Sequence, residues 1–155
     1  MKVKVIHKNQ GALRRMINRV AGFNDQVTVG VPEGAMHRSN GESISMALLA
    51  HIQNSGSVSR GIPARPFLIP ALQHNQDKYI KYLKSQTVSL ILGNVALSRV
   101  LNMLGQMAEA DVKKYFTGGH FAPLSASTIK AKGSSLPLID TGQLRQSITY
   151  KIERR

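Results

Sequence analysis

Hydrophobic and polar residues follow two different periods in the N-terminal part of the chain. Residues 2–6, Lys-Val-Lys-Val-Ile, alternate with a period of two, which predicts a short strand. From Asn9 to Ala21 the apolar residues adopt helical spacing, which predicts an amphipathic helix that ends near Gly22. The apolar positions of this helix are Leu13, Met16, Ile17 and Val20. Alternation returns in residues 25–31 and predicts a second strand.

The next segment is mainly polar. Residues 32–43 are rich in turn-forming residues and predict a flexible loop. Apolar spacing from Ile44 onward predicts a helix, which the sequence Asn54-Ser55-Gly56 would end. Residues 57–61 predict another loop.

Three prolines follow this loop. Pro63 and Pro66 favour extended backbone immediately before each of them. Pro66 also suits the first turn of a helix, where its missing N–H is harmless. Pro70 is late for the first turn of that helix, so the helix is expected to kink or to restart there.

One long helix is predicted over residues 95–116. Apolar residues recur there in steps of three and four, at Leu97, Leu101, Leu104, Ala108, Val112 and Tyr115. This spacing is typical of an amphipathic helix of about 30 Å, and Gly118 and Gly119 would end it. For residues 85–93 the pattern fits either a strand or the continuation of a helix, and both remain open.

The C-terminal part predicts three short elements. A short helix runs from Ser125, its cap, through Lys130, and a helical turn then leads into a strand at residues 147–152. This order of elements predicts an α+β fold in a single domain over residues 1–155. Several helices, including the long one at about 95–116, would pack on a small, mostly antiparallel sheet.

Charge adds a second kind of information. The chain has 21 Lys and Arg against 8 Asp and Glu, a net charge of +13, spread with no basic run longer than two. Such a field attracts polyanions and acidic protein surfaces. The absence of Cys excludes disulfides and thiolate metal sites. No apolar stretch of about 18 residues or secretory signal is recognisable, so a protein made and assembled in the cytoplasm, with no membrane partner, is expected.

One triplet, Asp140-Thr141-Gly142, resembles the active-site signature of retroviral-type aspartic proteases. Such an enzyme needs a flap, a substrate groove and a supporting strand after the triplet, and only residues 143–155 follow here. Pro137 also interrupts the approaching strand. The triplet therefore favours a backbone role, in which Asp140 or Thr141 caps the turn that begins at Gly142. With Asp140 as the cap, Gln143 falls at the third helical position.

Other catalytic and ligand-binding patterns do not emerge from the sequence. No two of the five histidines have the spacing of a metal site on one helix face. The chain has no Gly-x-Ser-x-Gly elbow and no phosphate-binding glycine loop. The sequence thus predicts no enzyme and no metal or other cofactor. For nucleic acids, residues 78–82, Lys-Tyr-Ile-Lys-Tyr, best combine aromatic and basic residues, which favours sequence-independent contact with DNA over specific recognition.

Two segments together resemble a known family. The first contains ALLAHIQNSG at residues 47–56 and GIPARPFL at residues 61–68, and the second contains PLIDTGQLRQSI at residues 137–148. This combination is similar to the neck and tail-completion proteins of long-tailed bacteriophages, also described as head–tail joining, virion morphogenesis or minor tail proteins. The resemblance covers roughly residues 25–150.

The resemblance implies a structural protein of the virion neck or tail. It would form a ring, of six copies by tail symmetry or of twelve, between the head connector or adaptor and the tail tube or terminator. Genomic DNA would pass through the lumen of the ring. The alternative is a small basic protein that binds DNA without sequence preference.

Eight residues of the two segments are candidates for structural or interface roles: Arg65, Pro66, Phe67, Asp140, Thr141, Gly142, Leu144 and Arg145. Arg65 would either fix the loop at residues 57–66 at a subunit interface or form a salt bridge within the subunit. Phe67 is expected in the core. Loops 32–43 and 117–122 are expected to become ordered through contacts between subunits.

Overall fold

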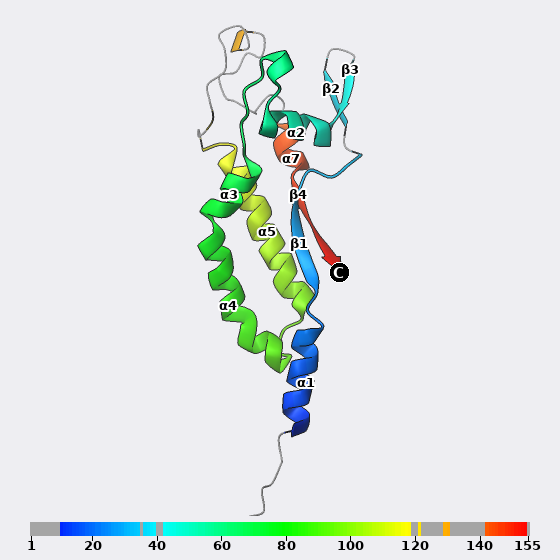
Figure 1. Cartoon of the computed structure of the whole chain (residues 1–155), viewed down its shortest axis with the longest axis vertical. Helices are drawn as coiled ribbons and strands as arrows, with labels where there is room; N and C mark the ends of the chain where they lie inside the picture. The colour runs from blue at the N-terminus through cyan, green and yellow to red at the C-terminus, as the bar shows by residue number, and fades with distance from the viewer. Residues whose placement is uncertain are drawn as a thin grey trace, which may run out of the picture.

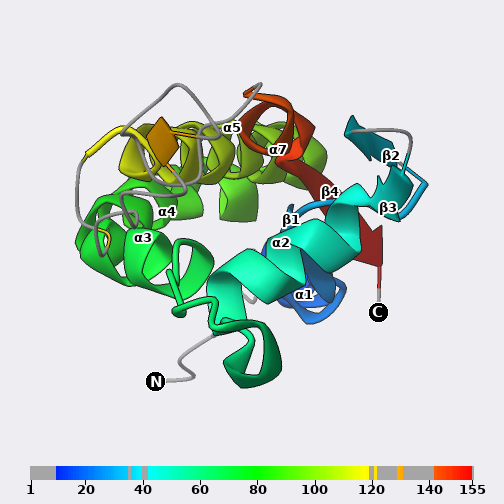
Figure 2. The same cartoon turned by 90° about the horizontal axis from the view of Figure 1, so that it is seen from above.

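The computed structural model describes residues 10–34, 36–39, 42–118, 121, 129–130 and 142–154. The fold is α+β, as the sequence predicted. The molecule is elongated (Figure 1). A long helix, residues 97–115, runs along its middle, with two consecutive helices, residues 68–74 and 76–92, on one side. On the other side lies an antiparallel pair of strands, residues 25–30 and 149–154, which is called the ribbon below. Figure 2 shows the same arrangement from above.

The helices are α1 (Gln10–Ala21), α2 (Met46–Ser55), α3 (Leu68–His74), α4 (Gln76–Leu92), α5 (Leu97–Tyr115), α7 (Gln143–Ser147) and the 3-10 helix η1 (Val58–Arg60). The strands are β1 (Asp25–Gly30), β2 (Met36–Ser39), β3 (Glu42–Ser45) and β4 (Thr149–Arg154). The predicted helix at residues 9–21, the strand at 25–31, the long helix at 95–116 and the final helical turn and strand are confirmed within a few residues. The predicted strand at residues 2–6 lies outside the described residues. In the predicted helix 125–130, only Ile129 and Lys130 are described, and both are helical.

The sheet consists of two separate antiparallel pairs in the described part of the chain. Strand β1 pairs with β4, with Val27 opposite Ile152 and Val29 opposite Tyr150. The second pair joins β2 to β3. Because β1 follows α1 and β4 ends the described chain, the first pair ties together segments that are far apart in sequence.

The prediction of a flexible loop at residues 32–43 was wrong. Strands β2 and β3 form a hairpin there, with Ser39 opposite Glu42. The two intervening residues in the sequence are Asn40 and Gly41, and Asn-Gly between two short strands is a strong signal for a tight hairpin. The prediction of a loop followed the polar composition of the segment and overlooked this local signal.

Helix α3 begins later than the prolines suggested. It starts at Leu68 rather than at Pro66, so Pro70 occupies the third helical position. A missing N–H is harmless in the first turn, and Pro70 therefore neither kinks nor restarts the helix. The chain instead breaks at Asn75, between α3 and α4. The open question at residues 85–93 is settled in favour of a helix, since α4 continues to Leu92 and ends at Gly93, whose φ is 83°.

Helix α5 organises the core. Its buried residues recur every three or four positions, at Val100, Leu101, Gly105, Ala108 and Val112. Gly105 allows close approach of the ribbon, because a Cβ atom at this position would overlap the ring of Tyr150 on β4. A larger residue at Gly105 would therefore separate the helix from the strand.

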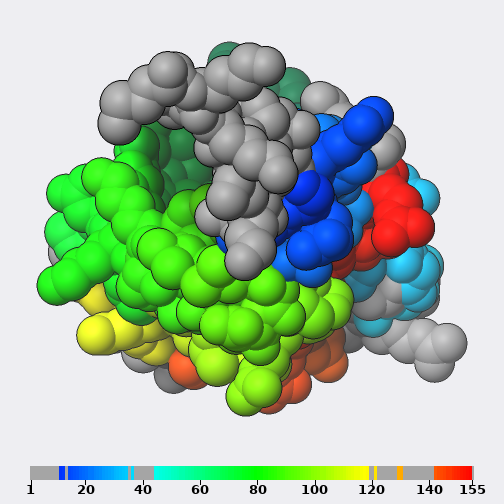
Figure 3. All heavy atoms as spheres, turned by 90° about the horizontal axis from the view of Figure 1, so that it is seen from below, coloured from blue at the N-terminus to red at the C-terminus, as the bar shows by residue number. Residues whose placement is uncertain are grey.

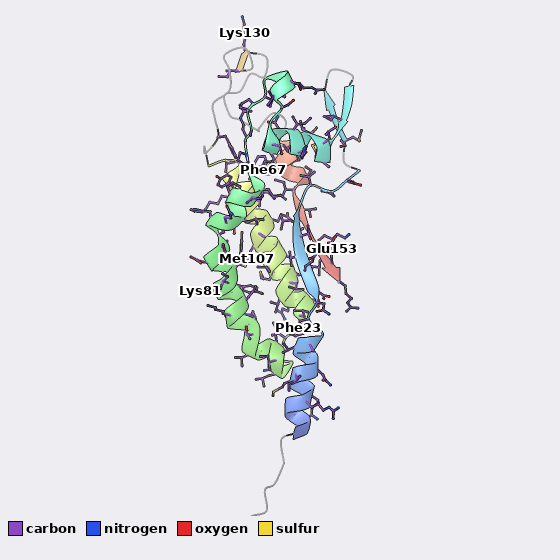
Figure 4. All side chains as sticks on the ribbon, viewed as in Figure 1. Phe23, Phe67, Lys81, Met107, Lys130 and Glu153 are labelled. Atoms are coloured by element: carbon purple, nitrogen blue, oxygen red, sulfur yellow. The ribbon has the colours of Figure 1, made fainter. Side chains whose placement is uncertain are left out.

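The densest part of the core lies at one end of α5. The rings of Phe67 and Phe116 pack with centroids 4.5 Å apart at an interplanar angle of 54°. Figure 4 shows Phe67 where α3 meets α5 and α7. Residues from α2, α3, α5 and α7 complete this cluster: Met46, Ala50, Ala71, Val112, Leu144 and Ile148. The aromatic pair and the residues around it thus join four helices.

We expect Phe67→Ala to lower the free energy of unfolding by about 3–5 kcal/mol, because Phe67 is only 3% exposed and removal of its ring would leave a cavity in the core. Urea unfolding followed by circular dichroism measures the change. Val58→Ala is the matched control, since Val58 is fully exposed, and it should change stability by less than about 0.5 kcal/mol. Equal losses in both variants would contradict this description of the core.

Candidate functional site

The segment that contains Arg65 forms a tight loop after α2. Ser57 and Ile62 exchange two backbone hydrogen bonds of 2.8 and 2.9 Å, which close the loop around η1. Gly56 precedes it with a φ of 76°, and a Cβ atom there would lie 2.7 Å from the backbone N of Ala64. Only glycine avoids both the strained conformation and the clash. The loop is therefore built by short-range backbone contacts.

The end of this loop is fastened to α2. The N–H of Arg65 donates to the carbonyl oxygen of Gln53 at 2.9 Å, and the N–H of Phe67 donates to Oδ1 of Asn54 at 3.3 Å. Arg65 is buried, with 6% exposure, whereas Pro66 between them is exposed. The two residues beside Pro66 thus point inward. A buried Arg65 favours the intramolecular role over the role at a subunit interface.

The second motif forms the short helix α7. Gly142 stands immediately before it with a φ of 74°, so it cannot be a helical residue itself. Gln143 therefore occupies the first helical position and not the third, which corrects the predicted register of the cap. Gly142 is itself the N-cap of α7, so the prediction that Asp140 or Thr141 caps this helix was wrong. Asp140 and Thr141 lie outside the described residues.

The two motifs meet in one core cluster. Leu144 and Ile148 are 6% and 0% exposed, and both belong to the cluster that contains Phe67. Arg145, one residue after Leu144, is exposed. The structure therefore brings Arg65, Phe67 and Leu144 into the interior and leaves Pro66 and Arg145 at the surface. Buried residues of this kind shape the subunit, and only exposed ones can contact a neighbour.

In the aromatic and basic segment at residues 78–82, Lys78 and the two tyrosines have their polar atoms engaged within the fold. The hydroxyl of Tyr79 donates to Oδ2 of Asp111 at 2.9 Å, and Lys78 forms an ion pair with the same carboxylate at 2.7 Å. The hydroxyl of Tyr82 donates to the carbonyl oxygen of Val100 at 3.4 Å. Both tyrosines are half-buried, rather than one buried and one at the surface. They hold α4 against α5 and are not displayed for stacking on bases.

The environment of Tyr79 opposes ionisation of its hydroxyl. Burial raises its pKa well above the usual range, and the hydrogen bond to Asp111 and the negative charge of that carboxylate raise it further. On the ribbon, hydrogen bonds from Gln26 and Lys151 lower the pKa of the Glu153 carboxyl. Neither group lies in a cluster that suggests catalysis.

An apolar groove lies beside α5, which sequence reasoning missed. It has a volume of about 330 Å³ and is lined by Val27, Val29, Leu72, Gln73, Gln76, Tyr79, Leu104 and Ala108. These residues come from β1, α3, α4 and α5. No sequence signal identifies such a groove, because it depends on how far α4 and β1 stand apart on the two sides of α5.

Two further features, a metal site and a membrane-spanning helix, concern only the residues that the structure describes. No group of three or more His, Asp or Glu side chains is placed to hold a metal ion there. None of the described helices is both long and apolar enough to cross a bilayer.

Comparison of the chain with protein-family models, with curated proteins and with solved structures gives no match.

Arg65→Ala should lower the free energy of unfolding by about 1.5–3 kcal/mol, because its guanidinium is buried and alanine removes that group together with its interactions. Arg60→Ala is the control, since Arg60 is an exposed arginine of the same loop and should be nearly neutral. Urea unfolding of both variants gives the comparison. A stable Arg65→Ala subunit that no longer associates would point to the interface role instead.

Tyr79 should make the protein sensitive to alkali. Its pKa is raised in the folded state, so its contribution is complete below the ordinary tyrosine pKa of about 10 and is lost as the pH rises beyond it. Tyr79→Phe should cost about 0.5–1.5 kcal/mol at pH 8 and weaken the decline between about pH 9 and 11. The hydroxyl of Tyr82 donates to a backbone carbonyl oxygen, so Tyr82→Phe should retain that decline. Urea unfolding across this pH range tests both, and an unchanged decline in Tyr79→Phe would refute the assignment.

Proposed function

We propose that this chain is a structural, non-enzymatic subunit of a bacteriophage virion, located in the neck or proximal tail. It joins the head connector or adaptor to the tail tube or terminator, and it forms a ring of six or twelve copies through which DNA passes. The subunits assemble in the host cytoplasm before the ring becomes part of the virion.

The observation that carries the proposal is exposed apolar surface, part of which lies at the two ends of the elongated subunit. At one end, on β2, α2 and η1, Met36, Leu48 and Val58 are 53%, 50% and 101% exposed. At the other end, on α1 and the last turns of α4, the exposed residues are Ile17, Val20, Val88 and Leu92. Figure 1 shows these elements at opposite ends of the long axis. Exposed apolar side chains of this size are suited to surfaces that contact other proteins.

The sequence resemblance supports the same proposal. The two motifs that carry it pack against each other through Phe67, Leu144 and Ile148. They therefore act as one structural unit, although about seventy residues separate them in the sequence. Motifs that serve the interior of a subunit suit a family of assembly proteins, whose surfaces adapt to different neighbours.

The basic charge has a place in this proposal. Lys81 and Lys84 are exposed on α4, and Figure 4 shows Lys81 extending away from α5 and the ribbon. In a ring, such residues can face either the DNA in the lumen or acidic surfaces of neighbouring proteins. The same residues also favour the second candidate function, sequence-independent binding of DNA by the isolated chain.

Association with particles tests the proposal. An epitope-tagged chain, produced in cells that assemble phage particles, should copurify with the particles at six or twelve copies each, counted by quantitative mass spectrometry. Gold-labelled antibody should mark the junction of head and tail in electron micrographs. Untagged particles provide the control. Full recovery of the chain in the particle-free fraction would count against the virion role.

The rival function predicts a different result. The isolated chain would bind duplex DNA at sub-micromolar concentration, with affinity falling steeply between about 50 and 200 mM salt. The double variant Lys81→Gln and Lys84→Gln would reduce the salt dependence and weaken binding to all sequences alike. Tight binding by the lone subunit, together with absence from particles, would favour the DNA-binding protein.

A further inference from the structure

Basic residues gather without acidic neighbours in the part of the molecule that contains α1. This part consists of α1, most of α4 and the first turns of α5, and Figure 3 shows these elements together at one end of the long axis. Residues 10–24 and 78–108, which include them, contain no Asp or Glu. The basic residues of the same two ranges are Arg14, Arg15, Arg19, Lys78, Lys81, Lys84 and Arg99.

Ion pairs within the described residues leave most of this charge in place. Lys78 pairs with Asp111 of α5 at 2.7 Å. The other six basic residues take part in none of the ion pairs that the described residues form. All six are exposed. They are called the basic end below: Arg14, Arg15, Arg19, Lys81, Lys84 and Arg99.

The neighbouring ribbon does not neutralise the basic end. Asp25 at the start of β1 lies 3.6 Å from Arg154 of β4. Glu153 lies 3.3 Å from Lys151 on the same strand. The two strands therefore carry two acidic and two basic residues, which pair with each other, and the ribbon adds no net charge beside the basic end.

The six cations are spread along the molecule rather than gathered around one point. Nη1 of Arg19 donates to the carbonyl oxygen of Ile91 at 2.8 Å, which fixes α1 at the end of α4. Helix α1 then continues beyond that end along the long axis (Figure 1). At 1.5 Å per residue, the cations extend over about 16 Å of α4 from Lys81 to its last turn and over about 8 Å of α1 from Arg19 to Arg14.

An extended row of cations suits a partner that is charged along its whole length. A DNA duplex presents a negative charge about every 1.7 Å of its axis, so cations at any spacing along the row can meet a phosphate. An acidic protein surface would instead need carboxylates placed to match each cation. On α1, Arg15 lies about half a turn from Ile17, so its side of the helix is not the apolar one.

We infer that the basic end binds the sugar–phosphate backbone of duplex DNA. The hydroxyls of Tyr79 and Tyr82 are engaged within the subunit, so the contact consists of cations and phosphates and does not read the base sequence. The inference rests on the proposed function for its setting, a ring through which DNA passes, and it names the part of the subunit that meets the DNA.

The experiment compares two triple variants of the purified full chain. The end variant combines Arg14→Gln, Arg15→Gln and Lys84→Gln, and it keeps Arg19 because that residue fixes α1. Fluorescence anisotropy measures the Kd for a labelled duplex of about 20 base pairs between about 50 and 200 mM salt. The loss of three phosphate contacts should weaken binding at least about 30-fold at the lowest salt. It should also reduce the slope of log Kd against log salt by about 2–3.

The control variant removes the same amount of charge from elsewhere. It combines Arg60→Gln, Lys114→Gln and Lys130→Gln, which are exposed outside the basic end, and Figure 4 shows Lys130 at the opposite end of the molecule. Both variants lower the net charge of +13 equally, so only the location of the charge differs. The control should change the Kd less than about 3-fold. Circular dichroism confirms folding, and Lys81→Gln with Arg99→Gln replaces an end variant that does not fold.

Four results would overturn the inference. The wild-type chain could show no binding to the duplex at about 50 mM salt. The two variants could lose affinity equally, which would show attraction by net charge alone. Poly-glutamate at equal charge concentration could displace the duplex, which would indicate an acidic protein partner. Vesicles of phosphatidylserine and phosphatidylcholine could bind more tightly than the duplex, which would indicate a lipid surface.

The proposed function is judged separately by the presence of the chain in particles. A chain found in particles whose two variants bind DNA equally would keep the virion role and overturn the inference. Binding that depends on the basic end, in a chain absent from particles, would support the inference and remove the virion role.

Discussion

The contact between Phe67 and Phe116 joins the start of α3 to the end of α5 within the main core cluster. Phe67 reaches it through a segment whose backbone is fastened to the end of α2, and Phe116 stands at the end of the long helix α5. Leu144 and Ile148 then bring the C-terminal segment onto the same cluster. Large aromatic side chains bury much apolar area, so this cluster positions α2, α3, α5 and α7 relative to one another.

Both basic and apolar residues are exposed on the surface of the subunit. Thirteen net positive charges keep copies apart, and the few uncharged surfaces are where they can meet. The groove beside α5 is such a surface, since no charged residue lines it, whereas α1 at one end of the long axis carries the exposed Arg14, Arg15 and Arg19. An assembly protein needs this division, because it must stay soluble as a single subunit and still recognise specific neighbours.

Local patterns predicted most of the helices and strands but few of the contacts between them. Period and spacing placed α1, β1 and α5 within a few residues, because their apolar positions repeat regularly. The hairpin of β2 and β3 was missed, although Asn40-Gly41 signalled it, since composition was given more weight than the turn. For the candidate site, Phe67 was correctly expected in the core. The burial of Arg65 was not foreseen, because nothing in the sequence says whether a loop arginine faces inward.

The sequence by itself determined which segments become helices and strands, where glycine must stand and how much charge the surface carries, because these depend on neighbouring residues and on composition. Only the tertiary structure decided that Phe67 meets Leu144 and Ile148, that Gly105 admits the ring of Tyr150, and that Ile17 and Val20 of α1 stay exposed. These relations join residues distant along the chain. Their distances are set by how the helices pack on one another, and no local pattern encodes that packing.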